Sequence, residues 1–180
     1  RRACRSRSRA QQTKKGCLMA SLDRLSGKDL LIIGRAGMDF YPDPPGTKTE
    51  EATHFFAALG GSSANIGVAL NKHGAGASLV TCVSDDAIGR YCLNQLDHYE
   101  VDRKHVRIVG GEARNSLAIV ESRFEDHQSV IYRNGAADFE MTSGDVQDLE
   151  FARYSALITT GTVFAAEPSR SAAFHAFDLA

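Results

Sequence analysis

Short apolar runs alternate with amphipathic segments along most of the chain, and this alternation predicts its secondary structure. Continuous apolar runs, typical of strands buried on both faces, occupy 30–34, 77–83 and 155–161. Apolar residues at helical spacing, together with Pro168 near a first helical turn, predict helices over 63–74, 86–99 and 167–180. Strands and helices in this alternation predict an α/β sheet with right-handed crossovers.

The spacing of apolar residues changes from a helical to a strand-like period between positions 116 and 135. "SLAIVESR" (116–123) and "QSVIYRNG" (128–135) are β-like runs separated by "FEDH", which predicts an antiparallel hairpin. The segment 52–59 is a further candidate strand, whereas 37–46 is rich in Pro and Gly and predicts a loop. We therefore expect an α/β core with a small antiparallel flap. A short helix over 142–149, capped by Thr142 or Ser143, is also expected.

Composition places the chain among soluble globular proteins. Its 180 residues are 43% hydrophobic and 24% charged, and no apolar run is long enough to cross a membrane. The four cysteines form no CxxC pair, so buried free thiols in a reducing cytoplasm are expected, and neither a disulfide framework nor a zinc site is.

Charge is spread unevenly. Residues 1–22 carry seven basic residues and no acid, which leaves 14 basic and 22 acidic residues for the remainder. We interpret 1–28 as a basic, disordered extension, part of which could precede a true start at Met19. A nucleic-acid-contacting arm and an organelle transit peptide are the alternatives.

Three predicted strand ends are polar and rich in glycine: "GRAGMD" (34–39), "GGSSAN" (60–65) and "TTGT" (159–162). Ligands of α/β sheets bind at the carboxyl ends of the strands. Gly60 and Gly61 would let a ligand approach the backbone, and Asn65 in the first helical turn can both donate and accept. Asp39 can accept from two hydroxyls, so the set suits a polyhydroxylated ligand such as a sugar. The alternative is a tight turn at Gly60–Gly61 with Ser63 as a helix N-cap.

A second polar feature, Asp85–Asp86, lies between a predicted strand and a predicted helix. Paired acids can bind a metal or perform acid–base chemistry, but this position favours capping of the helix.

Five segments occur in a characteristic order: "GRAGMDFYP", "LGGSSANIGVALNKHG", "VSDDAIGRYCLNQL", "VIYRNGAADFEMT" and "TGTVFAAEPSR". Their order and spacing resemble the ribokinase-like, or phosphofructokinase-B, family of sugar kinases over residues 29–180. Within that family the motifs are most similar to the 5-dehydro-2-deoxygluconokinase branch of inositol catabolism, followed by the 2-dehydro-3-deoxygluconokinases. Both branches act on acidic keto-deoxy sugars.

The resemblance implies a doubly wound sheet with a β-lid, which would use the segment around 50–59 and the hairpin 116–133. It implies that Asp39 holds sugar hydroxyls and that three further positions line the sugar pocket: Gly60, Gly61 and Asn65. Arg133, with Tyr132, would bind the substrate carboxylate, since a guanidinium pairs bidentately with a carboxylate. Arg35 is a second candidate anion ligand, and Gly161 with Thr162 would close the pocket floor. Two positions, Ser84 and Gly67, depart from the family pattern.

The same resemblance implies that ATP and Mg²⁺ bind mainly to a C-terminal half. Neither a GxGD motif nor a GxxxxGK[ST] loop occurs in residues 1–180, so the catalytic Asp is expected beyond Ala180. The chain by itself is therefore expected to be inactive. A homodimer through the lid is a further implication, and the remaining alternative is a catalytically inactive binding fragment with a nucleic-acid-contacting tail.

Overall fold

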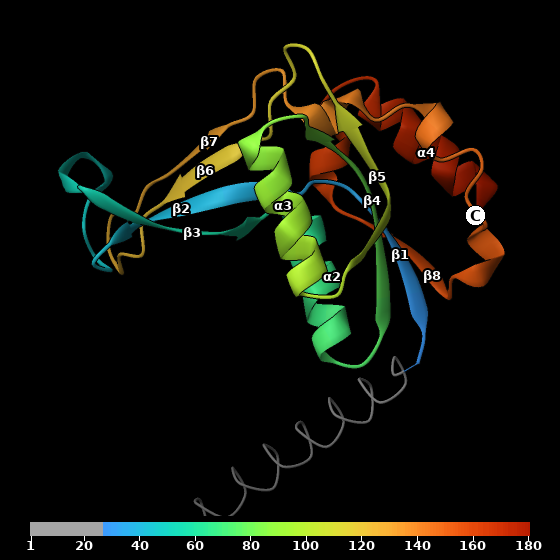
Figure 1. Cartoon of the computed structure of the whole chain (residues 1–180), viewed down its shortest axis with the longest axis horizontal. Helices are drawn as coiled ribbons and strands as arrows, with labels where there is room; N and C mark the ends of the chain where they lie inside the picture. The colour runs from blue at the N-terminus through green and yellow to red at the C-terminus, as the bar shows by residue number, and fades with distance from the viewer. Residues whose placement is uncertain (1–26) are drawn as a thin grey trace, which may run out of the picture.

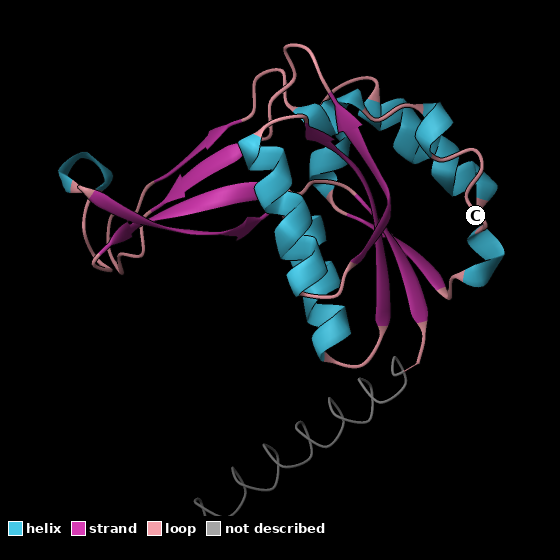
Figure 2. Cartoon of the chain, viewed as in Figure 1, coloured by secondary structure: helices cyan, strands magenta, loops and turns pink. Residues whose placement is uncertain are grey.

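The computed structural model describes residues 27–180, which form an α/β body and a lid that projects from it (Figures 1 and 2). Each part is built on its own four-stranded sheet. The basic segment predicted at the N-terminus lies outside the described residues, apart from Gly27 and Lys28.

The body sheet has the strand order β5-β4-β1-β8, and all its pairs are parallel. Its strands are β1 (Asp29–Ile33), β4 (Gly76–Ser84), β5 (Asp102–Val109) and β8 (Ala156–Thr159). Three of them are the predicted apolar runs. The strand β5 was not predicted, because this edge strand, "DRKHVRIV", is largely exposed and carries four charged or titratable side chains at its start.

Helices cover both faces of the body sheet, which confirms the doubly wound α/β prediction (Figure 1). Alternate strand residues separate the two layers: Ile32 and Leu79 pack toward α2 (Ser62–Lys72) and α3 (Ala87–His98). Leu31 and Val80 pack toward α4 (Ser169–Leu179). A strand turns successive side chains to opposite faces, so a continuous apolar run is what two covered faces require.

Short 3₁₀ turns complete the chain: η1 (Thr49–Glu51), η2 (Ala137–Glu140), η3 (Ser143–Asp145), η4 (Phe151–Arg153) and η5 (Gly161–Ala165). The helix predicted over 142–149 is only η3, although Thr142 does cap it through a capping box with Asp145. Asp86 caps α3 by accepting from the backbone N–H groups of Ile88 and Gly89, as predicted.

The lid sheet has the order β3-β2-β6-β7. Its strands are β2 (Gly37–Asp43), β3 (His54–Gly60), β6 (Leu117–Val120) and β7 (Ser129–Tyr132). The predicted hairpin is present as β6 and β7, but β2 pairs in parallel with β6, so the sheet is mixed rather than antiparallel.

The strand β2 replaces the loop predicted over 37–46. Proline disfavours a central strand because it cannot donate to the ladder. Pro42 is tolerated here because β6 pairs only with Met38–Phe40, which leaves β2 with a single neighbour, β3, at Pro42.

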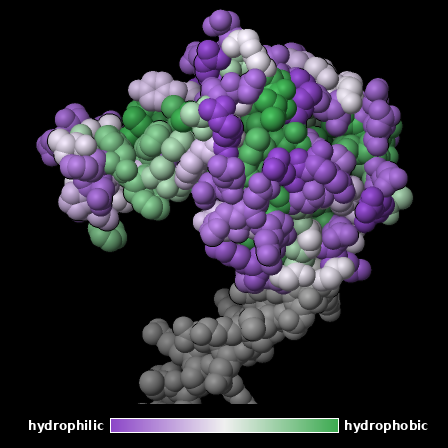
Figure 3. All heavy atoms as spheres, in the orientation of Figure 1, coloured by the Kyte–Doolittle hydropathy of each residue, from purple (hydrophilic) through white to green (hydrophobic). Residues whose placement is uncertain are grey.

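The lid strands expose several large apolar side chains, and the body exposes others on β5 and α4. Apolar residues gather on the projecting part of the molecule in Figure 3. The exposed large apolar side chains of the lid strands are Phe55, Phe56, Val130, Ile131 and Tyr132. Among the helices of residues 27–180, none has the length and apolar character that crossing a membrane requires.

Candidate functional site at the strand tips

Hydroxyl groups connect the three polar strand ends that the sequence singles out. The Oγ1 atom of Thr160, just after β8, lies 3.1 Å from the Oγ atoms of both Ser62 and Ser63 at the start of α2. It also lies 3.1 Å from Oγ1 of Thr162. Ser63 Oγ donates to the carbonyl of Ile33 at the end of β1. The ends of β1 and β8 and the N-terminus of α2 therefore form one polar surface.

Two glycines allow this close packing. An added Cβ at Gly34 would lie 2.1 Å from Ser63 Oγ, and one at Gly61 would lie 2.3 Å from the carbonyl oxygen of Arg35. Gly61 also has a φ of +96° and is itself the N-cap of α2, without a side-chain cap. The alternative in which Ser63 caps the helix is therefore wrong, because its hydroxyl is directed to Ile33 and Thr160 instead.

Asp39 on β2 is half-buried and lies against the bare Cα of Gly60 on β3. A Cβ at Gly60 would come within 2.0 Å of Asp39 Oδ1, so only glycine leaves room for the carboxylate. Oδ1 is buried and has no hydrogen-bond partner. Burial raises the pKa of Asp39, and the charge of Arg35 partly opposes that effect. The carboxylate therefore has an unfilled acceptor position.

Asn65 and Gly161 lie at the same end of the body. Asn65 is exposed in the first turn of α2, where its backbone N–H donates to the carbonyl of Gly61 at 3.0 Å. Gly161 opens η5 next to Thr160 and has no atom within 4 Å of an added Cβ. Both residues are close in the chain to members of the hydroxyl cluster, Ser63 and Thr160.

The two candidate anion ligands have different surroundings. Arg35, between β1 and β2, is 8% exposed, and its Nη1 donates to Ser116 Oγ at 2.8 Å. Arg133, just after β7, donates to Asp138 and, at 3.0 Å, to the carbonyl of Thr162. Its guanidinium also lies 4.1 Å from the centroid of the Phe139 ring. Arg133 thus joins the end of the lid to η2 and to η5, which follows β8.

The strand register separates Tyr132 from Asp39. Asp39 pairs with Ala118, which pairs with Ile131, and residues paired across strands share a face. Tyr132 is next to Ile131 and therefore points to the opposite face, where it is 59% exposed. The structure does not bring Tyr132 together with the Asp39 carboxylate.

A buried amide that the sequence pattern does not indicate, Asn115, lies beside this site. Asn115 accepts from the backbone N–H and the hydroxyl of Ser84 at 2.6 and 2.9 Å, and it donates to the carbonyl of Ala36 at 3.2 Å. Ser84, one of the two departures from the family pattern, is thus the partner of Asn115. The other, Gly67, lies where an added Cβ would be 3.3 Å from Val101 and 3.4 Å from Ile32, so α2 packs tightly on the sheet.

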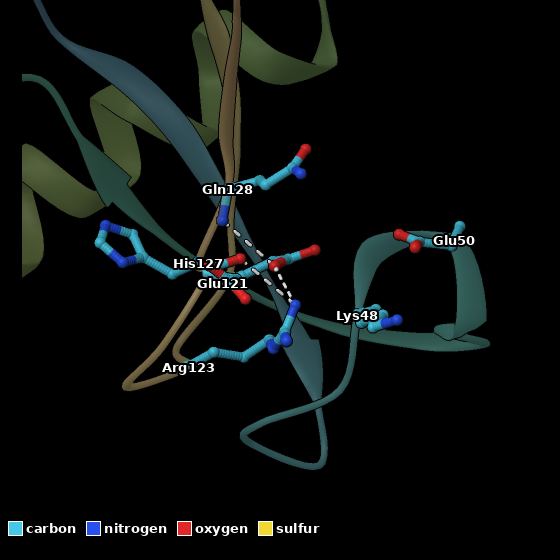
Figure 4. Close-up of a pocket in the computed structure, with 7 residues that line it drawn as sticks. Lys48, Glu50, Glu121, Arg123, His127 and Gln128 are labelled. Atoms are coloured by element: carbon cyan, nitrogen blue, oxygen red, sulfur yellow. Dashed lines mark hydrogen bonds and ion pairs between the residues drawn. The ribbon is translucent and has the colours of Figure 1, made fainter.

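A hollow of about 530 Å³ lies at the outer end of the lid, away from the strand tips (Figure 4). Its polar lining is Lys48, Glu50, Glu121, Arg123, Asp126, His127 and Gln128. Glu121 accepts from the backbone N–H groups of Thr49 and Gln128 and pairs with Arg123. Because these partners satisfy the buried carboxylate, we interpret the cluster as a structural connection between η1 and the β6–β7 turn.

Within the described range, no cluster of three or more His, Cys, Asp or Glu side chains has metal-binding geometry. Cys82 and Cys92 are buried free thiols, and burial raises the pKa of each to about 12.

Comparison with protein families gives a match over residues 28–180 to the model of the pfkB family of carbohydrate kinases. The 5-dehydro-2-deoxygluconokinase of Photobacterium profundum is 32% identical over 152 residues, which are 84% of this chain and 46% of that protein. The protein of the same name from Clostridium tetani is 31% identical over 153 residues, again 84% of this chain and 45% of that protein. The chain spans about half the length of the curated relatives it matches.

Solved structures give the same fold. The 2-dehydro-3-deoxygluconokinase of Thermotoga maritima superposes with a TM-score of 0.75 at 18% identity, over 84% of this chain and 47% of that one. Fructokinase from Xylella fastidiosa gives a TM-score of 0.73 at 21% identity, over 84% and 49% of the two chains. At these identities the likeness concerns the fold alone.

Proposed function

Since the chain belongs to the pfkB family of carbohydrate kinases, we propose that it supplies the sugar-binding half of a kinase for 5-dehydro-2-deoxy-D-gluconate. The phosphoryl group would be transferred from ATP to the terminal hydroxyl of this sugar acid. Curated relatives at about 30% identity carry that activity in their names, which supports the choice of substrate. The proposed alternative is 2-dehydro-3-deoxy-D-gluconate or the substrate of another sugar kinase of the family.

The observation that carries the proposal is the carboxylate of Asp39. Its buried Oδ1 lies against Gly60 without a partner, and a sugar hydroxyl is the donor that such an acceptor needs. Asn65, the backbone of Gly61 and the open position at Gly161 would contact further hydroxyls. The role of these residues is to bind and orient the sugar so that its terminal hydroxyl meets the phosphoryl donor.

We infer that the phosphoryl donor is held by residues other than those of this site. Phosphoryl transfer needs a positioned base, a metal ion and stabilisation of charge at the transferred group. The described residues contain no metal cluster, and the sequence contains no glycine-rich phosphate loop. We assign binding of ATP and Mg²⁺ mainly to the part of the relatives that this chain does not match, and we expect no phosphoryl transfer by the chain alone.

We also propose that the lid pairs with the lid of a second copy. Two aromatic side chains of β3, Phe55 and Phe56, are 40% and 66% exposed, and Ile131 on β7 is 56% exposed. Exposed apolar area of this kind favours burial against a partner surface.

Calorimetric titration of the chain with three sugars tests the substrate. We expect 5-dehydro-2-deoxy-D-gluconate to bind more tightly than 2-dehydro-3-deoxy-D-gluconate, and D-ribose to bind most weakly. Asp39→Asn should weaken binding of the first sugar by about tenfold or more, because the charged acceptor is lost. The matched control is Asp43→Asn, at the exposed end of the same strand, which should bind normally. Equal binding of all three sugars would contradict the proposal.

A further inference from the structure

The two arginines near the strand tips differ in how their positive charge is compensated. Arg133 is paired with the carboxylate of Asp138, which is 6% exposed, and its guanidinium stacks on Phe139. The same Nη2 atom also donates to the carbonyl of Thr162. Its charge is therefore already paired, although its Nε is buried without a partner, and a substrate carboxylate would have to compete with Asp138 for the guanidinium.

Arg35 has no such partner. It is 8% exposed and donates to the neutral hydroxyl of Ser116. No carboxylate of residues 27–180 lies within 4.0 Å of its guanidinium, since it forms none of the ion pairs of this part of the chain. Arginine keeps its charge in proteins, and a buried charge is costly unless it is paired. Arg35 is thus a buried cation whose nearest carboxylate, Asp39, acts on it only through space, without an ion pair.

The guanidinium of Arg35 lies next to the carboxylate that we assign to the sugar hydroxyls. A Cβ at Gly37 would be 3.1 Å from Arg35 Nη1, and a Cβ at Gly60 would be 2.0 Å from Asp39 Oδ1. Gly37 and Gly60 are direct partners in the β2–β3 register and have no side chains. The Arg35 guanidinium and the Asp39 carboxylate therefore lie over neighbouring glycines on one face of the lid sheet, where it joins the body. The Arg35 guanidinium and the Asp39 carboxylate are close, yet they form no ion pair. One ligand could therefore accept from Arg35 and donate to Asp39 at the same time.

We propose that Arg35, positioned by Ser116, binds the carboxylate of the sugar acid, and that Arg133 instead ties the lid to η5. The proposal rests on the sugar-acid kinase function above and deepens it by assigning specificity for the acid. A ligand with a carboxylate close to hydroxyls fits the pair: Arg35 offers charge-assisted hydrogen bonds to the first group, and Asp39 accepts from the second.

The test compares the sugar acid with a neutral counterpart of the same shape. The unaltered chain and its variants are titrated with 5-dehydro-2-deoxy-D-gluconate and with the primary amide of that acid. Arg35→Gln should weaken binding of the acid about a hundredfold and that of the amide no more than about threefold, because a buried charge pair is lost only with the acid. Arg133→Gln should leave the preference for the acid unchanged, as should the exposed control Arg90→Gln.

Two further variants distinguish a loss of binding from misfolding caused by a substitution at the buried position of Arg35. Arg35→Lys keeps the charge but loses the planar fork, so an intermediate loss of acid binding is expected. Ser116→Ala should reduce the affinity for the acid about threefold to tenfold, and the amide should be unaffected, because only the orientation of Arg35 changes. Circular dichroism confirms that each variant is folded.

The outcomes separate the two proposals. If the unaltered chain prefers the acid but folded Arg35 variants keep that preference, the role of Arg35 is wrong and the kinase proposal stands. If Arg133→Gln removes the preference instead, the roles of the two arginines are reversed. If the unaltered chain binds neither compound, both the substrate and the role of Arg35 are overturned.

Discussion

The body sheet and the lid sheet have four strands each, but different interactions hold them together. In the body, β1 and β4 are apolar and almost fully buried between two layers of helices. In the lid, all four residues of β7 are exposed, and buried polar groups provide the connections at its two ends. Asn115 joins the root of the lid to the body, and Glu121 joins the two loops at its tip. Stability in the body therefore depends on packed area, whereas the lid depends on its strand pairing and on a few hydrogen-bonded side chains.

The largest effect on stability should follow from a cavity in the body. Leu79 on β4 is fully buried in the cluster with Ile32 and Ala64, and Leu79→Ala should lower the free energy of unfolding by about 2–5 kcal/mol. The matched apolar truncation in the lid is Phe124→Ala, at a fully exposed side chain between β6 and β7, where a change below about 0.5 kcal/mol is expected. Urea unfolding of both variants measures the difference. Similar losses would contradict the contrast between the sheets.

A smaller loss is expected at the junction of the two sheets. Asn115→Ala leaves the backbone N–H of Ser84 and the carbonyl of Ala36 without their buried partner, which should cost about 1–3 kcal/mol. Amide hydrogen exchange should show the loss of protection concentrated at the start of β6. Asn94→Ala, at an exposed position of α3, is the control and should have almost no effect. A loss of protection spread evenly over the body would show that Asn115 is not a local connection.

The same contrast explains how far the sequence predicts the fold. Buried parallel strands require continuous apolar runs, so β1 and β4 were predictable, and so were the helices that cover them. The run at β8 was predicted as a buried strand too, but β8 lies at the edge of the described sheet and is only partly buried. An edge strand such as β5 and a lid strand such as β2 are exposed or contain proline, and a local pattern does not reveal them. Both β5 and β2 form strands because they pair with strands that are distant in the sequence or outside the local pattern.

The candidate site was predictable to a similar extent. Glycines, a carboxylate and hydroxyls at strand ends identified the polar surface around Asp39, because strand order alone brings those ends together. The different surroundings of the two arginines could not be predicted. Arg35 meets Ser116 across 81 residues, and Arg133 is paired with Asp138, whose burial depends on the packing of η2. Such partners follow from the tertiary fold and not from local spacing.

A third prediction separates stability from ligand binding where the sheets meet. Gly60→Ala places a methyl group where Asp39 Oδ1 lies, so the flexible carboxylate must move while the backbone stays. We expect a change of less than about 1 kcal/mol in the free energy of unfolding. Binding of the sugar acid should nevertheless fall by about tenfold or more, because a displaced acceptor no longer meets the hydroxyl. Gly110→Ala, where an added Cβ meets nothing within 4 Å, is the control. Unchanged sugar binding would mean that the position of Asp39 does not matter.

The smallest effect should be confined to the tip of the lid and should depend on pH. Hydrogen bonds from the backbone N–H groups of Thr49 and Gln128 and the nearby Arg123 lower the pKa of Glu121 from 4.5 to about 2. A carboxyl whose pKa is lowered by folding stabilises the native state above its unfolded pKa, and this contribution is lost as the pH falls from about 4.5 toward 2.

Amide protection of Thr49 and Gln128, corrected for the intrinsic exchange rate, should therefore decrease over that acidic range while protection of β1 and β4 persists. Glu121→Gln should reduce protection of these two amides already at neutral pH and remove most of the acid dependence, because the neutral amide is a weaker acceptor and does not titrate. Glu50→Gln, an exposed carboxyl lining the same hollow, serves as the control and should retain the normal pH profile (Figure 4). If the Glu121 variant kept full protection at neutral pH, the lid tip would be held by its backbone pairing and not by this carboxylate, and the lid would be more like the body than we infer.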